Sequence, residues 1–60
     1  MIELRLTDEQ AAVLRRILAS EVSDLGMEIA DTDSFDYRSG LKRTKRLALE
    51  LLERLDRNTA

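Results

Sequence analysis

Two stretches with a helical repeat of apolar residues, separated by only four residues, constrain the fold of this chain more than any other feature. The first stretch predicts a helix over residues 8–30, and the second predicts a helix over residues 35–57. Between them, residues 31–34 read Asp-Thr-Asp-Ser, and such side chains favour turns and helix caps. Two helices of similar length with so short a connection fold back on each other. The sequence therefore predicts an all-α fold: an antiparallel two-helix hairpin within a single domain, residues 1–60.

Each predicted helix carries one apolar stripe, and the two stripes are expected to face each other. If the chain folds about Thr32 and Asp33, large side chains face smaller ones at several levels, as interdigitation requires. Gly26 and Gly40 then fall at nearly the same level, which either reflects a close helix crossing or is incidental. The first stripe consists of Ala11, Leu14, Leu18, Val22, Leu25 and Ile29, and the second of Tyr37, Leu41, Thr44, Ala48, Leu51, Leu52 and Leu55.

The ends of both helices are marked by capping residues. Thr7 and Gln10 form a Thr-x-x-Gln capping box, which places the start of the first helix at Asp8. Ser34 is the expected N-cap of the second helix, with Asp33 as the next choice. Residues 58–60 are expected to form a frayed tail.

Residues 1–6 follow a different period, because three apolar side chains alternate there with Glu3 and Arg5. A period of two is typical of a half-buried strand, but a single strand has no partner within this chain. The segment is therefore either a strand that pairs with another chain or an extended arm whose apolar side packs on the helices. Both alternatives remain open from the sequence.

Several apolar side chains lie outside both stripes, and so small a monomer cannot cover them. A chain of 60 residues buries only about 60% of the surface that its unfolded form exposes, and this one has no cysteine with which to add disulfides. Exposed apolar surface beyond the first seam indicates an interface, for which the simplest partner is a second copy. We therefore expect a homodimer assembled from four helices. The predicted interface residues are Ile2, Leu4, Leu6, Val13, Ile17, Leu47 and Leu49.

A basic patch occupies the first half of the second predicted helix. Nucleic acid is one explanation for such a patch, but the net charge of the chain is −2. Carboxylates of the first helix, Glu21 to Asp31, lie at the level that these cations reach in an antiparallel hairpin. We therefore expect charge pairing within the hairpin and do not expect nucleic acid as a partner. The patch consists of Arg38, Lys42, Arg43, Lys45 and Arg46.

No residue pattern in the chain predicts catalysis, a cofactor or a metal. Neither cysteine nor histidine is present, which excludes metal sites that use those ligands and leaves the serines without a histidine base. Asp31, Asp33 and Asp36 do not match the ligand spacing of a calcium-binding EF-hand, and helix capping explains them. We expect a protein that is not an enzyme, with no catalytic, cofactor-binding or metal-binding residue.

The segment from Leu25 to Asp33, followed by Phe35, Tyr37, Arg38 and Leu41, resembles a group of short bacterial proteins of uncharacterised function. The resemblance extends from Leu6 to Leu55. It implies a helical hairpin with an "EIADTD" inter-helix segment, here Glu28 to Asp33. It implies no activity, ligand or catalytic residue.

These features predict a small helical module for interaction and oligomerisation. We expect the chain to form a homodimer and to bind a further, unidentified protein. The alternative is a DNA-binding regulator of the ribbon-helix-helix type, whose short strand and two helices are similar in outline. A first helix that ended before Gly26 would favour this alternative. A chain without cysteine, basic leader or long apolar run is expected in the cytoplasm, with no membrane contact.

Overall fold

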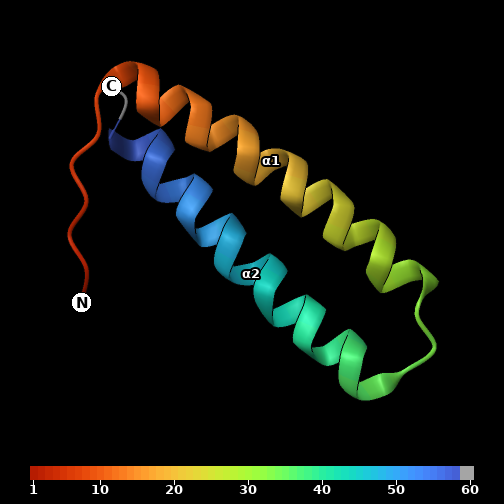
Figure 1. The fold of residues 1–60 in the computed structure, drawn as a ribbon. Helices are drawn as coiled ribbons and strands as arrows, with labels where there is room; N and C mark the ends of the chain where they lie inside the picture. The colour runs from red at the N-terminus through yellow and green to blue at the C-terminus, as the bar shows by residue number, and fades with distance from the viewer. Residues whose placement is uncertain (59–60) are drawn as a thin grey trace.

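A computed structural model describes residues 1–58 and shows two long helices side by side in opposite directions (Figure 1). Helix α1 spans Asp8–Asp31, helix α2 spans Phe35–Asn58, and residues 32–34 connect them. The predicted antiparallel hairpin is therefore confirmed, and each helix is one residue longer than expected. Asn58, predicted to belong to the tail, lies in α2, while residues 59–60 of that tail fall outside the described part.

Side chains at the two helix starts satisfy backbone groups as the sequence predicts. The Thr7 hydroxyl accepts from the Gln10 amide at 3.1 Å, and the Thr7 amide donates to the Gln10 side chain at 3.0 Å. At α2, the Tyr37 amide donates to the Ser34 hydroxyl at 3.4 Å, as expected of an N-cap. The Arg38 guanidinium donates to the carbonyl of Thr32 and so holds the connection against α2.

The α1 side of the seam matches the predicted stripe. Ala11 and Leu25 are buried, at 7% and 4% exposure, and the other four residues of the stripe are half-buried. All six side chains thus lie toward α2. The spacing of three and four residues was sufficient to identify this face, because one periodic stripe on a helix defines one direction.

The α2 side of the seam is rotated relative to the predicted stripe. Leu41, Ala48, Leu52 and Leu55 are buried or half-buried as expected. Three other members of that stripe are exposed, so their assignment to the seam is wrong: Tyr37, Thr44 and Leu51. In their place, Arg38 and Lys45 are half-buried. The Arg38 guanidinium donates to the Thr32 carbonyl and the Lys45 ammonium lies beside Gly26, so their aliphatic stems can pack along the seam.

The two glycines do not form a close helix crossing. A Cβ atom added to Gly26 would lie 3.7 Å from the Lys45 ammonium nitrogen, whereas one added to Gly40 would meet nothing within 4 Å. Gly26 therefore lies beside Lys45 of α2, and Gly40 faces open space. Neither glycine has a positive φ angle, so neither is needed for its backbone conformation.

Residues 1–7 precede α1 without helical or strand structure, and no strand is present anywhere in residues 1–58. This arm descends from the start of α1 past the C-terminal end of α2 (Figure 1). Leu6 is half-buried, while Leu4 and Ile2 are 70% and 92% exposed. Within one chain, the arm therefore covers its own hairpin only near Leu6. Pairing of two arms between copies stays a prediction.

Candidate interaction surface

The arm and α1 line a wide, open apolar groove at the open end of the hairpin. The groove has a volume of about 480 Å³. Val13 and Ile17, one helical turn apart, form part of its α1 wall, and both are exposed. The complete lining consists of Leu4, Leu6, Glu9, Gln10, Val13, Leu14 and Ile17.

A second hollow lies between the same arm and α2. It has a volume of about 290 Å³ and shares Leu4, Leu6 and Leu14 with the first groove. Its α2 wall includes Leu51 and Leu55. Leu47 lies one turn before Leu51, and both are 49% exposed. The aliphatic side chains along the arm, α1 and α2 at this end are exposed, except that Leu6 is half-buried. We call the surface that they form the apolar face: Ile2, Leu4, Leu6, Val13, Ile17, Leu47 and Leu51.

Six of the seven interface residues predicted from the sequence belong to this apolar face. Leu49 is also exposed, but it is two residues from both Leu47 and Leu51 and points to the opposite side of α2. Leu51 was missed because the sequence assigned it to the hairpin seam. Only the packing of the two helices places it on the surface.

The area left exposed is large for a protein of this size. A folded monomer of 6.9 kDa is expected to expose about 4,000 Å², whereas this hairpin exposes 5302 Å². Its radius of gyration is 13.4 Å, against about 10 Å for a compact chain of this length. Among the described residues, only Ala11, Leu25 and Ala48 are buried, and each keeps 4–7% of its surface exposed. The hairpin is a thin, elongated layer with one seam.

The basic patch predicted from the sequence separates into two parts. Arg38 and Lys45 are half-buried at the seam and act within the hairpin, through the Thr32 carbonyl and beside Gly26. The remaining three cations are exposed and line a shallow polar hollow of about 360 Å³ with Ser39 and Gly40. These cations are Lys42, Arg43 and Arg46.

The expected charge pairing between this patch and the carboxylates of α1 is absent from the part of the chain that the structure describes. The ion pair between the helices instead joins Arg15 and Asp56 at the open end, with 3.0 Å between the guanidinium and carboxylate. A second pair, Arg57 with Glu53 at 2.6 Å, lies within α2. Lys42, Arg43 and Arg46 are exposed on α2 and make no ion pair with the acids from Glu21 to Asp31 in the described residues.

No group of three or more acidic side chains within residues 1–58 is arranged to hold a metal ion. Neither helix, over its described length, is apolar enough to cross a membrane.

Comparisons with protein-family models, with curated proteins and with solved structures find no match to this chain. The resemblance to short bacterial hairpin proteins with an "EIADTD" segment accordingly stays a prediction.

Proposed function

We propose that this chain is a small, non-enzymatic helical module that forms a homodimer through its apolar face and presents the resulting four-helix assembly to a further protein partner. The exposed area is the observation that carries this proposal. The hairpin exposes 5302 Å², about 1,300 Å² more than a compact monomer of its mass. A standard stable interface buries about 800 Å² of each partner, so the excess is large enough to supply one.

The composition of the apolar face supports a second copy as the partner. Its central side chains are aliphatic and come from the arm and both helices, which gives a broad surface that resembles half of a core. Two such surfaces related by a two-fold axis bury each other. Stability that the single seam does not provide would then come from the contact between two layers of helices.

Sedimentation equilibrium at micromolar concentrations tests this proposal. The full chain should sediment at twice its 6.9 kDa mass. Ile17→Ser should shift the equilibrium toward the monomer, because Ile17 is 58% exposed on the apolar face and its loss should not unfold the hairpin.

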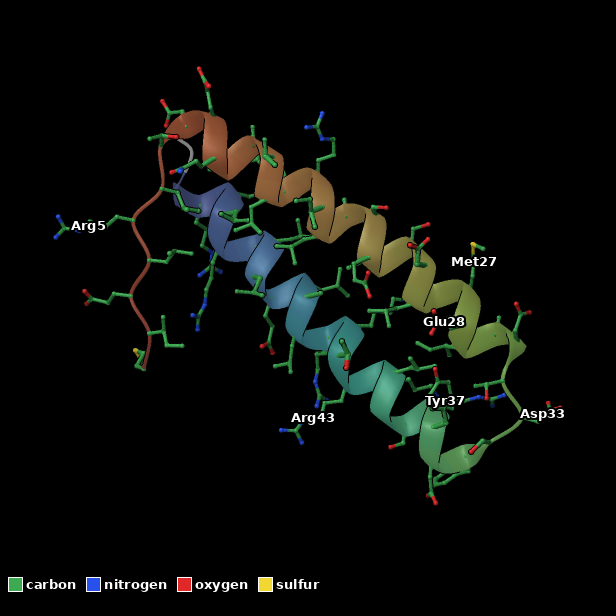
Figure 2. All side chains as sticks on the ribbon, viewed as in Figure 1. Arg5, Met27, Glu28, Asp33, Tyr37 and Arg43 are labelled. Atoms are coloured by element: carbon green, nitrogen blue, oxygen red, sulfur yellow. The ribbon has the colours of Figure 1, made fainter. Side chains whose placement is uncertain are left out.

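Met27→Ser is the matched control for Ile17→Ser. Met27 lies on the same helix and is 64% exposed, but Figure 2 shows its side chain directed away from α2 and from the arm. This variant should dimerise like the unaltered chain. A single 6.9 kDa species for the unaltered chain would overturn the dimer, and equal effects of both variants would show that another surface is used.

The ribbon-helix-helix alternative has no observation that favours it over this proposal. Helix α1 continues without interruption through Gly26 to Asp31, so the first helix does not end early as that alternative requires. We therefore do not propose DNA binding.

A further inference from the structure

We infer that the two-fold axis of the proposed dimer runs parallel to the helices, so that α1 of each copy packs antiparallel on α2 of the other. This inference rests on the dimer proposed above and specifies its geometry. It follows from the order of side chains along two surface ridges, one on each helix.

The ridge on α1 consists of Val13, Ile17 and Glu21, which are four residues apart and exposed. The ridge on α2 consists of Arg43, Leu47 and Leu51, with the same spacing and also exposed. Residues four apart lie side by side on a helix surface, and such rows interdigitate when two helices pack. Each ridge has two aliphatic residues toward the open end of the hairpin and one charge toward the connection.

A two-fold axis parallel to the helices keeps the direction and level of every helix. Leu14 and Leu51 line the same hollow, so they lie at similar levels at the open end of the hairpin. When α1 of one copy is placed over α2 of the other at that level, Val13 faces Leu51 and Ile17 faces Leu47. One further turn along, Glu21 faces Arg43. The aliphatic residues meet each other and the opposite charges meet.

An axis perpendicular to the helices gives a much poorer match. When the copies overlap along their full length, it reverses one copy end to end and places the aliphatic open end over the other copy's connection end. Val13 and Ile17 would then lie against exposed acidic positions of α1 such as Glu21 and Glu28. Burying aliphatic surface against unpaired carboxylates is unfavourable, so the charge pattern selects the parallel axis.

Neither charged residue of the two ridges is engaged within its own chain. In residues 1–58, no ion pair within 4.0 Å involves Glu21 or Arg43. Figure 2 shows the Arg43 side chain directed away from α1. An exposed ion pair adds little affinity, but two like charges at this position oppose association, so the pair would determine register more than strength.

The same axis accounts for the direction of the arms. Each arm leaves the start of α1 and crosses past the end of α2 (Figure 1). The two-fold rotation about an axis parallel to the helices reverses the direction in which the arm crosses the hairpin. The two arms therefore run antiparallel to each other at the same end of the dimer. Two paired copies of residues 2–6 that are related by a two-fold axis perpendicular to them are antiparallel.

Charge reversal tests the register. Glu21→Arg or Arg43→Glu alone should weaken the dimer about tenfold, because each creates two like-charge contacts per dimer. The double variant, Glu21→Arg with Arg43→Glu, should recover the affinity. Glu21→Arg combined with Arg46→Glu is the matched control: Arg46 is also exposed but lies off the α2 ridge, so affinity should not recover.

Cysteine cross-linking tests the same register by contact, because the chain has no native cysteine. Equal amounts of Ile17→Cys and Leu47→Cys chains, mixed and oxidised, should give mainly the mixed disulfide dimer. Mainly self-linked Ile17→Cys dimers, or no recovery in the charge-reversed double variant, would overturn the parallel axis. The dimer itself would stand if the unaltered chain still sediments at twice the monomer mass, so the two proposals fail separately.

Discussion

Truncation of Leu25 to alanine should destabilise the hairpin more than any change to an exposed leucine. Leu25 is 4% exposed and is the largest of the three buried side chains. Leu→Ala in a core costs about 2–5 kcal/mol, and the lower half of that range is expected here because a two-helix layer relaxes easily around a cavity. A domain of 60 residues has a total stability of about 3–9 kcal/mol. One substitution should therefore remove a large part of it.

Urea unfolding followed by the helical circular dichroism signal measures this cost, at one fixed protein concentration. Leu49→Ala is the control, because Leu49 is 46% exposed and lies off the apolar face. Its loss creates no cavity and should cost less than about 1 kcal/mol. Equal losses of unfolding free energy in the two variants would refute the assignment of Leu25 to the core.

Three further perturbations have outcomes that the structure defines. Gly40→Ala should stabilise α2 by about 1 kcal/mol, because its added Cβ meets nothing within 4 Å. Gly26→Ala should stabilise α1 by slightly less. A melting temperature below that of the unaltered chain in either variant would contradict the expected stabilisation. Thr7→Ala should cost about 1 kcal/mol by removing the capping box, measured by urea unfolding; no change would mean that the cap contributes nothing. Deletion of residues 1–6 should raise the dissociation constant of the dimer, and unchanged sedimentation would show that the arm takes no part.

The helices were predictable because their signals are local. The capping box at Thr7 and the periodic stripe from Ala11 to Ile29 depend only on spacing along one helix. Both helices accordingly begin where the sequence predicts and end within one residue of it.

The rotation of α2 was not predictable in the same way, because it depends on how two helices share a seam. The spacing of apolar residues placed Thr44 at the seam, whereas Lys45 is half-buried there and Thr44 is exposed; a lysine stem can pack at such a position. The same rotation moved Leu51 outward and enlarged the apolar face. The expected pairing between the helices is also absent from the described residues, where neither Glu21 nor Arg43 makes an ion pair.

The concentration dependence of thermal unfolding tests self-association most directly, because it uses the unaltered chain. If two hairpins form one folded unit, dilution favours the unfolded chain and the melting temperature falls. We therefore expect the melting temperature to rise steadily as concentration increases across the micromolar range. A melting temperature independent of concentration over that range would contradict a dimer and leave the hairpin as a stable monomer.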